Sequence, residues 1–85
     1  MPEAEPYHYV YILQCIAEPM RHHTGYTTDL QDRLRRHNSG DVPHTAMFDP
    51  WRIETVIRFS SKEKANAFER YLKIGSGFAF AKKHF

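Results

Sequence analysis

The chain is short of cysteine and of long apolar segments. Its 85 residues include one cysteine, Cys15, so no disulfide can form within the chain. The longest apolar run, residues 10–13, is far too short to span a bilayer. The sequence also lacks a cationic segment followed by a long apolar stretch, the pattern of a secretory signal. We therefore expect a cytoplasmic protein that has no disulfide scaffold and no membrane partner.

The length of the chain limits it to one small domain. Hydrophobic residues make up 41% of the sequence and include six Phe, five Tyr and one Trp, which is enough for one core. Residues 1–6 contain two prolines and two glutamates and no apolar pattern. We expect residues 1–6 to form a disordered start and residues 7–85 to form the single domain.

The positive charge lies towards the end of the sequence. The formal net charge is +2, but residues 62–85 carry six Lys or Arg against two Glu. This asymmetry is compatible with binding to a polyanion such as nucleic acid. A solvated helix face rich in lysine explains the same pattern, so charge alone leaves both interpretations open.

Three stretches have the composition of strands. Residues 7–16 are aromatic and β-branched with an apolar centre, as in a strand buried on both faces at the centre of a sheet. Residues 21–25 can return antiparallel to it and end at Gly25. Residues 51–59 alternate between apolar and polar side chains, which predicts a half-exposed third strand. This alternation places five side chains on one face: Trp51, Ile53, Thr55, Ile57 and Phe59.

A helix is predicted between Thr28, as its N-cap, and residues 38–40, which end it. Its buried stripe contains Leu30 and Leu34. Arg33 and His37 are four residues apart and border this stripe. They are therefore neighbours on one side of the helix.

Two more helices are expected near the end of the chain. Ser60 and Glu63 have the spacing of a capping box, and the apolar stripe that follows places Glu69 at its border. Residues 75–77 (Gly-Ser-Gly) are predicted to break this helix. A last short helix is expected over residues 78–83. The apolar stripe of the first of these two helices consists of Ala65, Phe68 and Leu72.

Several chemical hypotheses are disfavoured. The six histidines are accompanied by no cysteine pair and by no two histidines four apart, so a zinc site is not predicted. Cys15 has no cationic neighbour in sequence and is predicted to be a small buried side chain. Gly75 and Gly77 follow no strand and have no phosphate-loop spacing.

The order and spacing of the remaining motifs resemble one family, the GIY-YIG nuclease superfamily, and in particular its short stand-alone bacterial members. The resemblance covers about residues 7 to 83. The segments that carry it are residues 10–13, His23-Thr24-Gly25, Thr28-Asp29-Leu30, Arg33, His37, Asn38-Ser39-Gly40, His44-Thr45-Ala46, Pro50-Trp51, Ala67-Phe68-Glu69, Leu72-Lys73 and residues 76–82.

This resemblance implies an α+β fold, a three-stranded antiparallel sheet flanked by helices, and a divalent-metal-dependent endonuclease that hydrolyses DNA phosphodiester bonds in duplex or branched DNA. It implies that Tyr11 takes a proton, Arg33 binds phosphate oxygens, His37 positions water or phosphate, and Glu69 binds Mg²⁺ or Mn²⁺. Each residue also has a structural interpretation. Tyr11 fits a core, Arg33 and His37 fit a helix C-terminus, and Glu69 can pair with a lysine at i+4.

The chain departs from the family pattern at His23 and again near its end, where similar proteins usually have Ser-Gly-Ser-Gly-Arg and this chain has Ile74 and Phe78 at the first and last of these positions. It also has no clear equivalent of the asparagine that some family members use late in the site. His23 replaces the tyrosine that usually stands two residues before the glycine, and imidazole is shorter than phenol although it also exchanges protons near neutral pH. Phe78 stands where similar proteins usually have arginine. These departures favour an alternative function, a catalytically weakened nucleic-acid-binding module. A third hypothesis, a protein-interaction or structural domain, also fits the sequence, although no obligate protein partner can be predicted.

Overall fold

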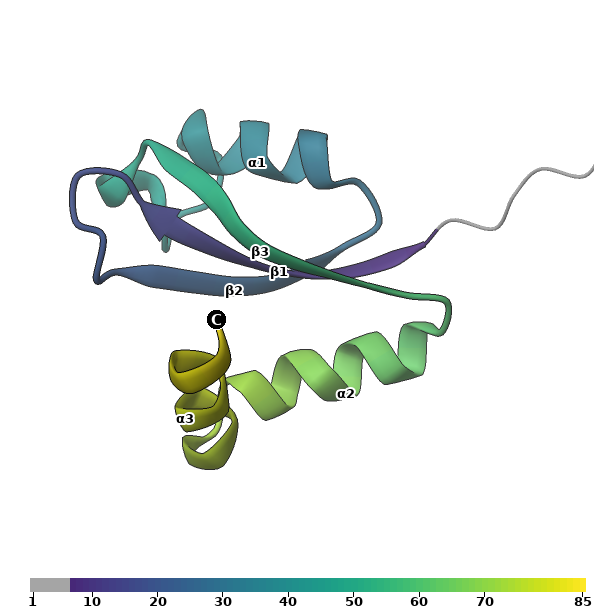
Figure 1. Ribbon diagram of the computed structural model, residues 1–85. Helices are drawn as coiled ribbons and strands as arrows, with labels where there is room; N and C mark the ends of the chain where they lie inside the picture. Colours follow the sequence, from purple (N-terminus) through teal and green to yellow (C-terminus); the bar gives the residue numbers. More distant parts are fainter. Residues whose placement is uncertain (1–6) are drawn as a thin grey trace, which may run out of the picture.

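The computed structural model describes residues 7–85, apart from the side chain of Phe78. The predicted start, residues 1–6, lies outside the described part. No helix within residues 7–85 is long and apolar enough to cross a membrane. The elements, shown in Figure 1, are β1 (His8–Cys15), β2 (His22–Thr27), α1 (Leu30–Asn38), the 3₁₀ helix η1 (Ala46–Phe48), β3 (Trp51–Phe59), α2 (Lys62–Leu72) and α3 (Gly75–His84).

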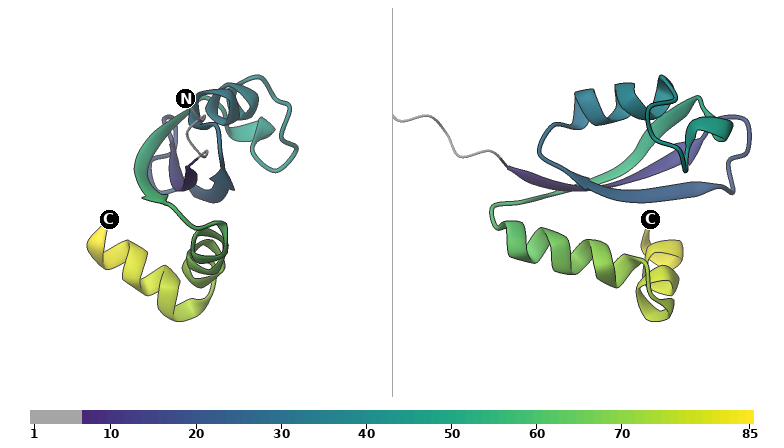
Figure 2. Two further views of the ribbon diagram at one scale, coloured as in Figure 1. Left: turned by 90° about the vertical axis from the view of Figure 1, so that its right-hand side faces the viewer. Right: turned by 180° about the vertical axis from the view of Figure 1, so that it is seen from behind.

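The three strands form one antiparallel sheet in the order β2-β1-β3, so the predicted α+β fold is confirmed and the apolar strand β1 lies at its centre. Helix α1 covers one face of the sheet and α2 lies against the other (Figures 1 and 2). Alternate residues of β1 contribute to both faces, because successive strand side chains point in opposite directions. Tyr11 and Leu13 pack towards α1, whereas Val10 and Ile12 pack towards α2.

Strand β3 contains an irregularity that changes the face of its side chains. Leu13 pairs with Ile53 but Ile12 pairs with Thr55, so Glu54 is an extra residue on β3. A bulge of one residue inverts the alternation beyond it. Trp51 and Ile53 therefore pack with the α1-side cluster, whereas Phe59 packs with the α2-side cluster. The prediction that residues 51–59 present one continuous apolar face was wrong.

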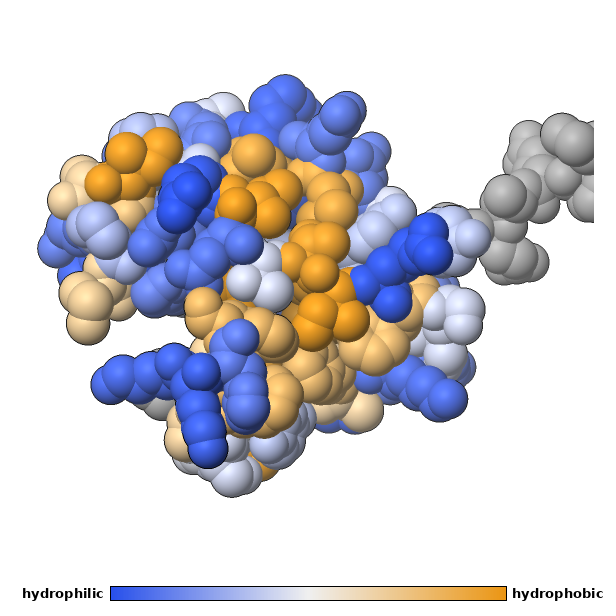
Figure 3. All heavy atoms as spheres, viewed as in Figure 1, coloured by the Kyte–Doolittle hydropathy of each residue, from blue (hydrophilic) through white to orange (hydrophobic). Residues whose placement is uncertain are grey.

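Figure 3 shows a consequence of this inversion. A band of hydrophobic residues runs from beside α1, across β3, to α2 on the face in view. The opposite edge of the sheet is formed by β2, which faces the viewer in the right panel of Figure 2.

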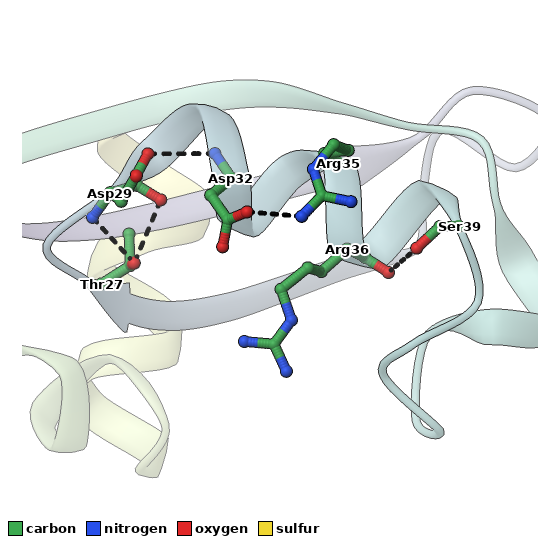
Figure 4. Close-up of polar contacts among 6 residues, drawn as sticks. All are labelled: Thr27, Asp29, Asp32, Arg35, Arg36 and Ser39. Carbon is green, nitrogen blue, oxygen red and sulfur yellow. Dashed lines mark hydrogen bonds and ion pairs between the residues drawn. The ribbon is translucent and has the colours of Figure 1, made fainter.

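Helix α1 is capped one residue later than predicted. Asp29, not Thr28, is the N-cap, and its side chain accepts a hydrogen bond from the backbone N–H of Asp32 at 3.0 Å. Thr27 Oγ1 accepts from the Asp29 N–H at 3.0 Å and so fixes the entry of the chain into the helix (Figure 4). The helix ends as predicted, with Gly40 at φ 83°, a conformation that favours glycine.

The boundaries of α2 and α3 also differ from prediction. Ser61, not Ser60, caps α2 by accepting from the Lys64 N–H at 3.2 Å. Residues 75–77 do not break the chain into a loop but form the first turn of α3. Gly77 is buried, and a Cβ atom there would overlap the backbone carbonyl of Tyr71. The glycine therefore serves close packing of α3 against the end of α2, which sequence spacing alone does not reveal.

Replacing Gly77 with alanine should lower the free energy of unfolding by about 1–3 kcal/mol, because the methyl group forces α3 away from α2. Urea denaturation would measure this. Gly75→Ala is the matched control, since a Cβ at Gly75 meets no atom within 4 Å. Equal stability of the two variants would contradict the packing role of Gly77.

Candidate active site

Tyr11 is placed by the pairing of β1 with β2. It lies opposite Gly25, and the phenol ring covers this glycine so closely that a Cβ atom there would overlap the phenol oxygen. The absence of a side chain at Gly25 therefore lets the Tyr11 phenol reach the β2 edge. Tyr11 is only 2% exposed.

His37 lies in the last turn of α1 and contacts Tyr11 directly. Its Nε2 is 3.0 Å from the Tyr11 phenol oxygen, and its Nδ1 is 2.7 Å from Thr45 Oγ1. The imidazole is 1% exposed, and both ring nitrogens are hydrogen-bonded to protein groups. Direct positioning of water or phosphate by His37 does not fit this geometry. The imidazole contacts the phenol of Tyr11 and the hydroxyl of Thr45.

His23 belongs to the same cluster. Its ring centroid is 4.9 Å from that of His37, 6.4 Å from that of Tyr11 and 6.4 Å from that of Trp51. The side chain is half-buried on β2. The residue that replaces the family tyrosine therefore lies beside the other predicted site residues.

Arg33 lies one turn before His37 on α1 and is half-buried. It lines a small hollow together with Tyr11 and Leu30. Burial has the largest effect on the pKa values of Tyr11, His23 and His37. The positive charge of Arg33 acts on all three in the downward direction. Arg33 and Tyr11 line the same hollow, which brings the guanidinium to the side of the phenol.

Glu69 approaches from α2, on the other side of the sheet. Its carboxylate accepts from Lys73 Nζ at 2.9 Å, so the predicted alternative, an i+4 ion pair, is present. Burial has the largest effect on the pKa values of Tyr11 and His23. The negative charge of the Glu69 carboxylate acts on both in the upward direction. The Glu69 side chain is 20% exposed. Glu69 thus forms the ion pair, and within residues 7–85 its carboxylate acts on the Tyr11 cluster through its charge and not by a hydrogen bond.

The surroundings set the charge states of the cluster at neutral pH. Burial raises the pKa of the Tyr11 phenol, with Arg33 acting against burial and Glu69 adding to it. Burial also lowers the pKa of His37 to about 4, assisted by His23, Arg33 and Arg36. The pKa of His23 is lowered by burial and then by Lys73 and His44. Both imidazoles are therefore neutral and the phenol is protonated.

Within residues 7–85, the residues of this cluster offer a divalent metal a single carboxylate, that of Glu69. The part of the chain that the structure describes contains no group of three or more His, Cys, Asp or Glu side chains arranged as metal ligands. Mg²⁺ is commonly bound by one or two carboxylates together with waters and substrate phosphates. The partly exposed Glu69 carboxylate is the donor in the cluster that suits this kind of binding. Lys73 competes for it.

The hydrogen bonds of the loop between α1 and β3 were not predicted from the sequence. The Asn38 side chain accepts from the Trp51 backbone N–H at 2.6 Å and donates to the Trp51 carbonyl at 3.1 Å. Trp51 Nε1 donates to the Thr45 carbonyl at 3.0 Å. These bonds hold Thr45 against His37. The sequence signal was the segment His44-Thr45-Ala46, which resemblance marked without giving it a role. The side chain of Phe78, the second departure, lies outside what the structure describes.

Comparisons with known proteins identify the family to which the chain is similar. A model of the GIY-YIG catalytic domain matches residues 7–78. UPF0213 protein HQ_3675A of Haloquadratum walsbyi is 54% identical over 68 residues, which cover 79% of this chain and 74% of that protein. UPF0213 protein BH0048 of Halalkalibacterium halodurans is 40% identical over 67 residues, 78% of this chain and 69% of that one. The solution NMR structure of the UPF0213 protein BH0048 from Bacillus halodurans matches with a TM-score of 0.48 and 40% sequence identity, covering 79% of this chain and 70% of that chain.

Proposed function

Because the chain belongs to the GIY-YIG family, whose domain indicates a nuclease-type function, we propose that it is a divalent-metal-dependent endonuclease that hydrolyses DNA phosphodiester bonds. The observation that carries the proposal is the contact between the Tyr11 phenol oxygen and His37 Nε2 at 3.0 Å, with the charges of Arg33 and Glu69 beside it. The Tyr11 phenol and the His37 imidazole are in direct contact, and the Arg33 guanidinium and the Glu69 carboxylate act on the phenol through their charges.

In the proposed reaction, Tyr11 and His37 move the proton of the attacking water. The water oxygen forms the new bond to phosphorus while its proton passes to the Tyr11 oxygen, and the phenol proton passes to His37 Nε2. The bond from phosphorus to the leaving oxygen then breaks, and this oxygen departs as an alkoxide that takes a proton from solvent water. This relay is needed because burial raises the pKa of the phenol, so Tyr11 is not a phenolate beforehand. A neutral His37 is in the right charge state to accept the proton.

The cations of the cluster have a separate role. Charge accumulates on the non-bridging phosphate oxygens as water attacks, and hydrogen-bond donors fixed in advance stabilise it. Arg33 presents a planar guanidinium suited to two such oxygens. Mg²⁺ or Mn²⁺ bound through Glu69 would stabilise charge on the phosphate and the leaving oxygen. His23, which is neutral, has a ring N–H available to a third oxygen of the phosphate.

The second candidate function is a catalytically weakened GIY-YIG module that binds nucleic acid. The raised pKa of Tyr11 and the presence of His23 in place of a phenol favour it. Binding through phosphates must weaken linearly with the logarithm of salt concentration, whether or not cleavage occurs. A module of this kind would show that salt dependence with no cleavage in either metal.

The test of the endonuclease proposal is a substitution of Glu69. Glu69→Gln should lower cleavage of supercoiled plasmid and of branched DNA in Mg²⁺ or Mn²⁺ by at least roughly tenfold, because an amide is a poorer ligand for a hard cation. Glu63→Gln, which changes an exposed carboxylate at the start of the same helix, is the matched control. Equal residual cleavage in both variants would contradict the proposal.

The remaining features of the proposal rest on the sequence. We propose duplex or branched DNA as the partner, with no membrane partner and no obligate protein partner, and the cytoplasm as the location. A single domain over residues 7–85 likewise stays a prediction. Expression of residues 7–85 alone, followed by thermal unfolding, would check it.

A further inference from the structure

Thr45 is buried beside the proposed proton relay and has no part in it so far. Its side chain is 1% exposed, and its hydroxyl oxygen lies 2.7 Å from His37 Nδ1. The same hydroxyl donates to the Val42 carbonyl at 3.3 Å. The threonine is therefore placed between a carbonyl, which can only accept, and an imidazole, which accepts or donates according to its tautomer.

A neutral imidazole carries one proton, so two arrangements of hydrogens are conceivable. With the proton on Nδ1, this N–H donates to Thr45 Oγ1, the threonine hydroxyl donates to the Val42 carbonyl, and the Tyr11 hydroxyl donates to Nε2. Each hydrogen then has an acceptor at hydrogen-bonding distance. With the proton on Nε2, the imidazole donates to Tyr11 and accepts from Thr45. The hydrogen of the phenol then needs another acceptor.

The phenol hydrogen decides between the two arrangements. Within residues 7–85, the Tyr11 hydroxyl has His37 as its one hydrogen-bond partner, and the residue is 2% exposed. A buried donor without an acceptor is disfavoured. The Val42 carbonyl keeps hydrogen bonds in both arrangements, because it also accepts from the backbone N–H groups of Thr45 and Ala46 at 3.1 and 3.0 Å. The arrangement with the proton on Nδ1 is therefore the more stable one.

We propose that Thr45 is a positioning residue that holds His37 as the Nδ1–H tautomer, which leaves Nε2 free to take the phenol proton of Tyr11. The bonds from Asn38 to Trp51 and from Trp51 to the Thr45 carbonyl keep the threonine in place. The tautomer itself does not depend on nuclease activity, whereas its effect on cleavage rests on the proposed function.

The tautomer is measured directly on the metal-free protein. In a long-range ¹H–¹⁵N correlation spectrum at neutral pH, His37 should show Nδ1 at the shift of a protonated ring nitrogen and Nε2 at that of an unprotonated one. Its signals are assigned by their loss in His37→Gln. The opposite pattern in the wild-type protein would overturn the proposal, even if no cleavage by this protein is ever detected.

Two variants test the role of the hydroxyl. Thr45→Val keeps the shape but removes the acceptor for Nδ1–H, so His37 should shift towards the Nε2–H tautomer. kcat for plasmid cleavage should fall roughly tenfold at unchanged KM, the factor that corresponds to losing one neutral hydrogen bond. Thr45→Ser restores the hydroxyl and should restore both the tautomer and kcat.

Thr55→Val is the control for the same chemical change elsewhere in the fold, because Thr55 lies on β3 opposite Ile12. It should leave the tautomer and kcat as in the wild type. A Thr45→Val protein whose His37 spectrum matches the wild type would overturn the proposal. So would equal losses of kcat in Thr45→Val and Thr45→Ser, since these would point to packing rather than to the hydroxyl.

Discussion

Replacing Tyr11 with phenylalanine should lower kcat for DNA cleavage by roughly 10²–10⁴-fold, the usual contribution of a positioned acid or base. The ring still fits over Gly25, because the change removes one oxygen and adds no atom. What is lost is the group that takes the proton from water and passes its own to His37. Single-turnover cleavage of a nicked or branched duplex would measure the chemical step free of product release.

Tyr26→Phe is the matched control for this substitution. Tyr26 also pairs its phenol with a histidine, His8 Nδ1 at 2.7 Å, but it packs against the α2-side cluster, outside the site. Its loss should leave kcat within about twofold of the wild type, because the Tyr26 phenol contacts His8 and neither Tyr11 nor His37. Equal rates for Tyr11→Phe and Tyr26→Phe would remove Tyr11 from the reaction.

The same variant separates catalysis from binding. Loss of a proton-transfer group affects the transition state and not the ground-state contacts with phosphate, so the affinity of Tyr11→Phe for DNA and its salt dependence should match the wild type. If wild-type protein and Tyr11→Phe bind DNA alike and neither cleaves it, the weakened binding module is the correct function.

The sequence was informative where local pattern and tertiary environment agree. The run at residues 10–13 predicted a central strand, and β1 is indeed paired on both sides. The histidine and arginine four apart on α1 were predicted to be neighbours near the apolar stripe. The structure places both beside Tyr11. Periodicity is enough for such inferences because it depends on helix and strand geometry alone.

The errors come from features that local pattern does not encode. The bulge at Glu54 reverses which face of the sheet the later side chains of β3 point to. The alternation of apolar and polar residues in the sequence does not reveal that an extra residue interrupts the pairing with β1. The glycines at 75 and 77 suggested a break, whereas Gly77 is needed for contact between two helices. The role proposed for Thr45 depends on its contact with the buried imidazole of His37, eight positions earlier in the sequence. A resemblance marks such a residue without saying what it contacts.

Electrostatics was the least predictable part of the site. The resemblance implied that the Tyr11 phenol takes a proton, and the positive charge of Arg33 does act to lower the pKa of the phenol. Burial has the larger effect, however, and the phenol pKa is raised. The net direction depends on how deeply Tyr11 and His37 are covered, which requires coordinates. A relay through His37 is the chemistry that remains compatible with a protonated phenol.

The burial of His37 should also make the stability of the fold depend on pH. The folded protein binds a proton at His37 only below a pKa of about 4, whereas the unfolded chain binds it below the ordinary value of about 6.5. Between these two values the unfolded state holds the extra proton, so acid favours unfolding. The stabilisation from a neutral His37 is complete above the ordinary pKa and is lost as the pH falls towards the lowered one. At about 1.4 kcal/mol per pH unit, the loss is on the order of 3 kcal/mol.

Urea denaturation at a series of pH values through this window would measure the effect. His37→Gln should be less stable at neutral pH, because its side chain reproduces the bonds to Tyr11 and Thr45 imperfectly, but its stability should fall less steeply with acid. His84→Gln, which removes an exposed histidine at the end of α3, is the control and should retain the wild-type slope. His23 has a pKa lowered in the same direction, so part of the slope should persist in His37→Gln. Parallel curves for the wild type and His37→Gln would mean that the imidazole is not held neutral by burial, and the proton relay would then lose its acceptor.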